Sequence, residues 1–110
     1  MSKYKAKKVE WYGKRFDSQK EFSRWRELCA MEKAGLISDL RLQVPFELIP
    51  AIRENGKTIQ RATHYIADFV YQENGKTVVE DVKSPATRTE VYKLKRKLMR
   101  YVHGIDIQEV

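Results

Sequence analysis

Apolar residues recur every three or four positions between residues 17 and 35, a spacing that predicts an amphipathic helix. The apolar positions of this helix are Phe22, Trp25, Leu28 and Cys29. Asp17 or Ser18 is suited to cap its start, and Ser18 with Glu21 has the spacing of a capping box. Gly35 is placed to end the helix, because glycine readily adopts the left-handed conformation that follows many helices.

A second helical pattern runs from residue 87 to residue 104. Its apolar positions are Val91, Leu94, Leu98, Tyr101 and Val102. An amphipathic helix usually turns such a stripe toward the core, so we expect these side chains to pack inward. Pro85 ends the strand that precedes this helix, which begins at Thr87 or Thr89. Gly104 is placed to end it.

The middle of the chain alternates apolar and polar residues with the period of β-strands. One extended segment carries its apolar side chains at Leu40, Leu42 and Val44. Pro45 follows directly and favours an edge strand or a bulge, because proline has no N–H for a ladder hydrogen bond. Residues 105–110 supply a closing strand, with apolar side chains at Ile105, Ile107 and Val110.

Asn55 and Asn74 are each followed by glycine, the strongest short signal for a two-residue β-hairpin turn. The turn at Asn74 makes residues 62–72 and 77–83 antiparallel partners, and residues whose numbers sum to 149 should then face each other. The elements follow the order helix, strand, strand, strand, helix, strand. This order describes a single α/β domain with a mixed sheet.

Three charged residues interrupt the apolar run VVEDVKS at residues 78–84. Because side chains alternate along a strand, Asp81 and Lys83 share one face and Glu80 points to the other. The hairpin register puts Asp68, the charge within YIADFVY, opposite Asp81. Like charges directly opposite each other are destabilising, so a cation between these two acids would remove a cost. Glu80 needs a separate partner, and a helix lysine is the simplest one.

The ion that suits these two acids is Mg²⁺ or Mn²⁺, because the ligands would be oxygen atoms and the chain has one cysteine and two histidines. Such an ion suits phosphodiester hydrolysis, since it acidifies water and neutralises phosphate charge. Lys83 could orient the water, stabilise developing negative charge or act as a base. An ordinary Asp–Asp–Lys ion-pair cluster is the alternative, and the residues alone leave it open.

The net charge of +7 favours a polyanionic partner: DNA, RNA or an acidic membrane surface. Lys3, Lys5, Lys7 and Lys8 form a basic amino-terminal arm within residues 1–16. The second helix and its approach carry six more basic residues, Arg88, Lys93, Lys95, Arg96, Lys97 and Arg100. Contact with phosphate or simple solvation explains this basic side of the helix equally well, and the net charge favours the former.

The composition also restricts the class of protein. Hydrophobic residues make up 42% of the chain and charged residues 34%, which is typical of a globular rather than a disordered chain. No apolar run is long enough for a signal peptide or a membrane span, so we expect a cytoplasmic protein. The lone Cys29 has no partner in the chain for a disulfide and is expected to be a small core residue.

Asp68, a hairpin and the run Asp81-Val82-Lys83 together resemble the D…(D/E)-x-K signature of the PD-(D/E)XK nuclease superfamily. The core of that superfamily has the same order of helices and strands as the one predicted above. The segments FDSQKEF, YIADFVY, VVEDVK and VYKLKRKLM look like a small, phage-borne, uncharacterised family of Gram-positive bacteria. Holliday junction resolvases of archaeal and phage type are similar to that family. The resemblance covers nearly the whole chain.

This resemblance implies a restriction-endonuclease-like core over residues 1–110 and a Mg²⁺- or Mn²⁺-dependent DNA endonuclease. Its site would consist of Glu21, Asp68 and Asp81 as metal ligands and Lys83 as the catalytic lysine. Glu21 has an alternative role in the capping box, and it could serve both. The implied substrate is branched DNA in phage recombination or replication, cut by a homodimer in the cytoplasm of the bacterial host. A non-catalytic, basic nucleic-acid-binding module is the alternative function.

Overall fold

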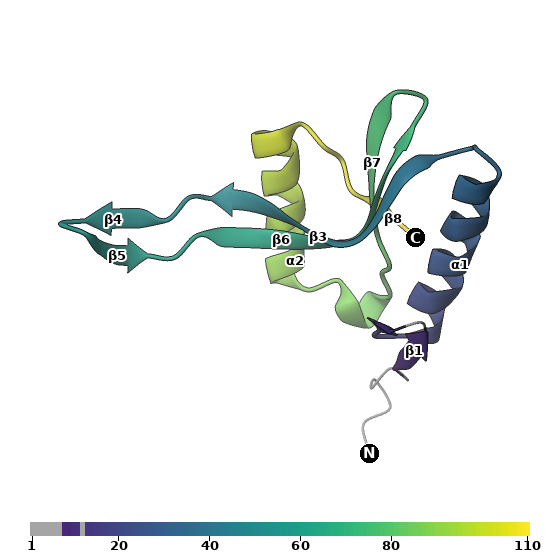
Figure 1. Ribbon diagram of the computed structural model, residues 1–110. Coiled ribbons are helices and arrows are strands. Elements are labelled where there is room, and N and C mark those ends of the chain that lie inside the picture. Colours follow the sequence, from purple (N-terminus) through teal and green to yellow (C-terminus); the bar gives the residue numbers. More distant parts are fainter. Residues whose placement is uncertain (1–7, 12) are drawn as a thin grey trace, which may run out of the picture.

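The structure of the protein is a computed structural model that describes residues 8–11 and 13–110. Its strands and two main helices form an α/β fold (Figure 1). In chain order the elements are β1 (Val9–Trp11), β2 (Lys14–Phe16), α1 (Gln19–Lys33), β3 (Ser38–Ile49), β4 (Ile52–Glu54), β5 (Lys57–Gln60), β6 (Thr63–Glu73), β7 (Lys76–Asp81), the 3₁₀ turn η1 (Pro85–Thr87), α2 (Glu90–Leu98), the π-helical turn η2 (Met99–His103) and β8 (Gln108–Glu109).

Four strands form a mixed sheet in the order β3-β6-β7-β8. β3 and β7 are antiparallel to β6, whereas β8 is parallel to β7. The elements α1, β3, β6, β7, α2 and β8 therefore have the order predicted from the sequence, and the predicted mixed sheet is confirmed. β3 lies at the edge of this sheet, a position that accommodates Pro45 as expected.

Helix α1 begins and ends as its sequence indicates. The Ser18 hydroxyl accepts a hydrogen bond from the backbone N–H of Glu21 at 3.1 Å, so Ser18 rather than Asp17 is the cap. Gly35 follows the helix with φ +78°, the left-handed conformation predicted for it. The helix packs on the sheet through Trp25 and Leu28, with Phe22 and Cys29 beside them.

Both Asn-Gly pairs form tight hairpins. Asn55 and Asn74 each have φ +51°, and the glycine that follows each has φ +76°, as type I′ turns require. The β4–β5 hairpin is separate from the main sheet and projects far from the two helices (Figure 1). Every residue from 50 to 61 is exposed, and we call this segment the extended hairpin.

A third hairpin, β1–β2, turns at Gly13 and packs on α1. Phe16 is fully buried in the cluster of apolar side chains beneath α1. Trp11 lies 5.8 Å from Phe22 between ring centroids. These aromatic residues therefore pack against the helix, as the energetics of aromatic burial favour.

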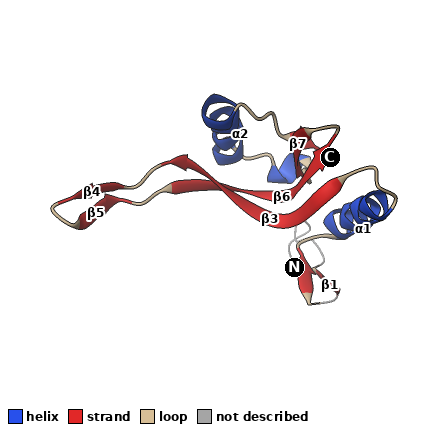
Figure 2. Cartoon of the chain, turned by 45° about the horizontal axis from the view of Figure 1, so that its top comes forward, coloured by secondary structure: helices blue, strands red, loops and turns tan. Residues whose placement is uncertain are grey.

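The sheet has a different helix on each face (Figure 2), and strand β6 changes faces partway along its length. Tyr65 and Ala67 pack in the cluster beneath α2, whereas Phe69 and Tyr71 pack beneath α1. Val70, between the last two, belongs to the α2 cluster, so the clusters lie on opposite faces. Regular alternation would keep all four odd-numbered side chains on one face. The strand therefore turns over between Ala67 and Phe69.

The orientation of α2 differs from the one predicted. Tyr92 and Met99 face the sheet and are buried. Most of the predicted apolar stripe faces solvent instead: Val91 is 63% exposed, Leu94 58%, Tyr101 87% and Val102 45%. Tyr92 and Met99 are seven residues apart and form a second apolar face of the helix, which the sequence prediction left out.

Among the described residues, no helix is both long and apolar enough to cross a membrane.

Candidate functional site

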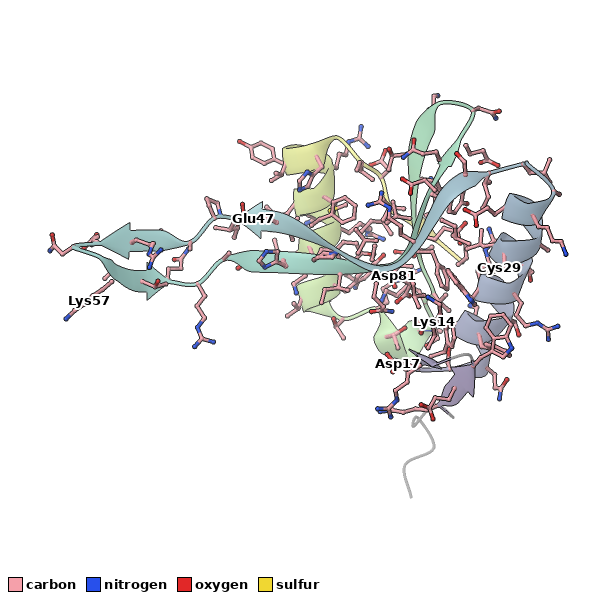
Figure 3. The ribbon with its side chains drawn as sticks, viewed as in Figure 1. Lys14, Asp17, Cys29, Glu47, Lys57 and Asp81 are labelled. Carbon is pink, nitrogen blue, oxygen red and sulfur yellow. The ribbon has the colours of Figure 1, made fainter. Side chains whose placement is uncertain are left out.

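A cavity of about 430 Å³ lies between the strands and the beginning of α2. The lining residues that carry chemistry are Asp17, Gln43, His64, Asp68, Asp81, Lys83 and Lys95. They come from three neighbouring strands, from the segment that follows β7, from the loop before α1 and from α2. Figure 3 shows Asp81 near the centre of the molecule, where the long strands cross between the two helices. The fold therefore brings together polar groups that are far apart in the chain.

The register between β6 and β7 is the one that the Asn-Gly turn predicts. Phe69 faces Glu80, a pair whose numbers sum to 149. The ladder ends there, and Asp68 and Asp81 occupy the next position on each strand. Asp68 Oδ2 accepts a hydrogen bond from the backbone N–H of Val82 at 2.8 Å, which holds its carboxyl group beside the end of β7.

The two aspartates interact directly. Burial raises the pKa of Asp68 to about 8, and the hydrogen bond and negative charge of Asp81 add to this shift. Asp81 is only 4% exposed and accepts a hydrogen bond from Tyr65 Oη at 2.8 Å. Burial, with the charge of Asp81 second, also raises the pKa of Tyr65. At neutral pH the pair is therefore stabilised by anything that supplies a proton or a positive charge.

Lys83 supplies one positive charge next to this pair. Its Nζ lies 3.2 Å from Asp81 Oδ2 and 4.1 Å from the ring centroid of Tyr92. The backbone is fixed by the carboxyl end of the chain, because Lys83 N donates to the carbonyl oxygen of Val110 at 3.1 Å. Val110 N in turn donates to the carbonyl oxygen of Asp81 at 3.0 Å. Val110, directly after the short strand β8, thus helps to position both residues.

Glu21 lies near the pair without joining it. Its side chain is buried, and Gln43 Nε2 donates to Glu21 Oε1 at 3.4 Å. Burial and the charge of Asp17 raise the pKa of Glu21, and the charge of Asp81 raises it slightly further. In the part of the chain that the structure describes, no group of three or more acidic, histidine or cysteine side chains is arranged to hold a metal. Of the three predicted ligands, Asp68 and Asp81 therefore form a close pair, and Glu21 lies nearby.

The donor set at the pair fits Mg²⁺ or Mn²⁺. Asp68 and Asp81 offer only oxygen atoms, and Mg²⁺ is commonly held by one or two carboxylates while water and phosphate complete its shell. A divalent ion would also offset the repulsion that contributes to the raised pKa of Asp68. The pair could hold the ion, and Glu21 lies close enough to act on it electrostatically.

Gln43 is a candidate functional residue that the sequence reasoning missed. Its φ is +55° within β3, where an ordinary strand residue has a negative φ, and such conformations often mark functional sites. Like β6, β3 changes faces here: Leu42 packs beside the α1 cluster and Val44 beside the α2 cluster. Gln43 lies opposite Asp68 in the register and donates to Glu21. In the sequence, Gln43 is one of several polar residues that alternate with apolar ones along the predicted strand, and nothing distinguishes it from the others.

Glu80 lies on the opposite face from Asp81, as alternation predicted, but the prediction of a lysine partner for it is wrong. Arg24 of α1 binds both carboxylate oxygens, with Nε 2.8 Å from Oε1 and Nη2 2.7 Å from Oε2. Tyr71 Oη also donates to Glu80. The planar guanidinium matches a carboxylate in a way that lysine does not, which suits the 2% exposure of Glu80.

Several of the basic residues predicted to bind DNA form ion pairs within the chain. The pairs are Arg88 and Arg96 with Glu109, Arg100 with Asp106, and Lys93 with Glu90. Lys95 instead lines the cavity, and Lys97 is exposed. The carboxyl-terminal segment therefore offsets part of the positive charge on α2.

The basic amino-terminal arm is only partly within the described residues. Lys3, Lys5 and Lys7 lie outside them, and Lys8 is exposed. The predicted contribution of this arm to DNA binding therefore stays a prediction from the sequence.

These observations define an α/β protein with a mixed sheet and a cavity lined by an aspartate pair and a lysine, with a buried glutamate nearby. The chain belongs to the family described as "Protein of unknown function (DUF1064)", which matches residues 1–108. No curated protein and no solved structure matches the chain significantly. The chemistry of the cavity therefore carries the functional argument.

Proposed function

We propose that this protein is a metal-dependent endonuclease with a restriction-endonuclease-like core, which hydrolyses phosphodiester bonds in branched DNA. The observation that carries this proposal is the convergence of Asp68, Asp81 and Lys83 in one cavity at the end of the β6–β7 ladder. The resemblance to Holliday junction resolvases supports branched DNA as substrate, a homodimer as the active form, and phage recombination or replication in the bacterial cytoplasm as the setting.

A purely structural ion-pair cluster accounts less well for the cavity. The chain contains such a cluster elsewhere, where Nε and Nη2 of Arg24 bind the two carboxylate oxygens of the buried Glu80. Asp68, in contrast, has another carboxyl group as its neighbour and a raised pKa. Because burying two acids together costs stability, the arrangement favours a site that takes up a cation in use.

The residues have separate roles in this proposal. Asp68 and Asp81 would hold the metal ion, which supplies positive charge at the scissile phosphate and makes a water molecule easier to deprotonate. Lys83, fixed between Asp81 and the ring of Tyr92, provides a second positive charge for the phosphate and a donor that orients the water. Gln43 lines the cavity, and its hydrogen bond to the buried Glu21 links β3 to α1.

The charge of the chain supports a nucleic acid as substrate. Its net charge is +7, and Lys95 lines the same cavity as the aspartate pair. Lys97 and Lys8 add exposed positive charge, and such residues contact phosphate without reading the sequence of bases.

Incubation of the purified protein with labelled linear, flap and four-way DNA, with and without Mg²⁺ or Mn²⁺, tests the proposal. We expect metal-dependent cleavage with preference for a branched substrate. Protein that binds these DNAs but cuts none of them with either metal would favour the non-catalytic nucleic-acid-binding module.

A further inference from the structure

The extended hairpin is longer than the fold requires. The β3–β6 ladder ends where Ile49 pairs with Thr63, and a two-residue turn is enough to join two antiparallel strands there. The chain instead continues through β4 and β5, which form a sheet of their own. Every residue from 50 to 61 is exposed, so the hairpin adds no buried side chain to the core. A projecting segment of this kind is typical of a binding surface.

The hairpin nevertheless has a defined shape. Its turn at Asn55 is tight, and in its register Arg53 lies opposite Thr58 and Glu54 opposite Lys57. Its two strands extend from the ends of β3 and β6, away from both helices, in both views of the chain (Figure 1, Figure 2). Figure 3 shows Lys57 near the far end. The hairpin is therefore a narrow, two-stranded ribbon that a partner can reach from either face.

The ribbon carries positive charge that the rest of the fold does not neutralise. Its basic residues are Arg53, Lys57 and Arg61, and its acidic residue is Glu54. Glu54 lies opposite Lys57, so these two charges offset each other. Among the described residues, no salt bridge involves Arg53 or Arg61, whereas most of the basic residues of α2 pair with acids. These two arginines are therefore available to a negatively charged partner.

We propose that the extended hairpin lies in the major groove of duplex DNA, with Arg53 and Arg61 on phosphate groups. The major groove of B-form DNA is about 12 Å wide and admits a two-stranded ribbon, whereas the minor groove is only about 6 Å wide. Ile52 and Ile59 are 46% and 61% exposed. In the major groove they would meet thymine methyl groups, an apolar feature that the minor groove lacks.

The ribbon is continuous with the candidate site. His64 and Asp68 line the cavity from β6, the strand that follows the hairpin. Arg61 precedes Asp68 by seven residues, and Thr58, opposite Arg53, precedes it by ten. At about 3.3 Å per strand residue, these positions lie at most roughly 23 Å and 33 Å from Asp68, or about 7 and 10 base pairs. The hairpin would thus contact the duplex within one helical turn of the cut, a placement that rests on the proposed function.

Other occupants fit the ribbon less well. The major groove of duplex RNA is deep and narrow, and protein side chains do not reach its bases. A stable interface between proteins uses about 20–30 residues on each side, which is about twice the number in residues 50–61. Duplex DNA matches both the width of the ribbon and its charge.

Fluorescence anisotropy with a labelled duplex about two helical turns long tests the contact, in EDTA so that no DNA is cut. Arg53→Gln combined with Arg61→Gln should raise the dissociation constant by about tenfold or more at about 0.1 M salt. It should also lower the logarithmic salt slope by about 1.8, or about 0.9 for each lost phosphate contact.

Lys33→Gln combined with Lys76→Gln is the matched control. It also removes two exposed positive charges, but both lie outside the hairpin and the cavity. This variant should bind the duplex as the wild-type protein does. Circular dichroism checks that both double variants fold.

Methylation by dimethyl sulfate identifies the groove, because the reagent attacks guanine N7 in the major groove and adenine N3 in the minor groove. Saturating wild-type protein should protect N7 more than N3, and the hairpin variant at its own saturating concentration should lose this difference. Equal affinities of the hairpin and control variants would overturn the proposal. So would protection of N3 alone, equal binding of duplex RNA, or a wild-type protein that does not bind the duplex. Hairpin-dependent binding of DNA that is never cut with Mg²⁺ or Mn²⁺ would support the contact and contradict the proposed function.

Discussion

Asp68 and Asp81 follow the last paired residues of the β6–β7 ladder and hold their carboxyl groups against each other, which helps burial to raise the pKa of Asp68 to about 8. Lys83 lies 3.2 Å from the same Asp81. One lysine therefore faces two acids in a largely buried position. Lys83 balances the charge of Asp81, and the proton on Asp68 is what a bound cation would replace.

Removing either end of the Asp81–Lys83 pair should abolish metal-dependent cleavage. We expect Asp81→Ala and Lys83→Ala to lower the cleavage rate of branched DNA by about 100-fold or more, because each removes a group that acts at the phosphate. Binding to a four-way junction should change little in a mobility-shift assay. Glu27→Ala removes an exposed acid outside the cavity and should cut normally. Undiminished cleavage in both site variants would show that the site is elsewhere.

The raised pKa of Asp68 makes the stability of the metal-free protein depend on pH. Between its ordinary value of 3.8 and about 8, the folded protein holds a proton on Asp68 that the unfolded chain releases. The free energy of unfolding should therefore fall as pH rises through this window. Urea unfolding at pH 5 and pH 8 measures the change.

Asp68→Asn carries no titrating proton and should flatten this pH dependence. Mg²⁺ should stabilise the wild-type protein more at pH 8 than at pH 5, because the two carboxylates are then free to bind it. The exposed Asp106 offers a control, and Asp106→Asn should behave as wild type does. Equal slopes for Asp68→Asn and wild type would contradict the assigned coupling.

The pair formed by Arg24 and Glu80 should matter for stability rather than for cleavage. Among the described residues, Arg24→Met leaves Tyr71 as the one side-chain donor to the buried carboxylate of Glu80, and we expect it to lower the free energy of unfolding by about 3–5 kcal/mol. Arg24→Met combined with Glu80→Met removes both charges and should recover much of the loss. A cost below about 1 kcal/mol for the single variant, the value of an exposed ion pair, would show that water reaches Glu80.

The basic amino-terminal arm should make the binding of DNA more sensitive to salt concentration. Replacing Lys5, Lys7 and Lys8 with alanine should weaken binding to DNA and reduce the dependence of the binding constant on salt concentration. The logarithmic slope should fall by about 0.9 for each phosphate that the arm no longer neutralises. Fluorescence anisotropy over a range of salt concentrations measures this slope. An unchanged slope would mean that the arm does not touch DNA.

Local features of the fold were readable from the sequence. The Asn74 turn fixed the register of the hairpin that it joins, and that register brings Asp68 next to Asp81. Ser18 and Gly35 marked the limits of α1 for equally local reasons. Such features depend on a few consecutive residues, so the backbone preferences of those residues decide them.

Features that depend on distant residues were not readable. Arg24 and Glu80 are 56 residues apart, and only the packing of α1 on the sheet selects an arginine over the lysines nearby. The orientation of α2 was predicted wrongly because Tyr92 and Met99 compete with the aliphatic stripe for the core. The role of Gln43 could not be predicted, because the point at which β3 changes faces depends on how both of its ends pack in the fold.

Substitutions at Gln43 separate the cost of backbone strain from the effect of its side chain on cleavage. Gln43→Gly should stabilise the fold by about 1 kcal/mol, because glycine adopts φ +55° at little cost. It should also reduce cleavage, since the amide that donates to Glu21 is removed. Gln43→Asn is the matched variant: asparagine also tolerates this conformation, but its side chain is one methylene shorter and falls short of Glu21. We expect it to cut slowly while keeping wild-type stability in urea. Normal cleavage in both variants would make Gln43 a residue of the fold alone, and a loss of stability in Gln43→Gly would show that the bond to Glu21 outweighs the strain.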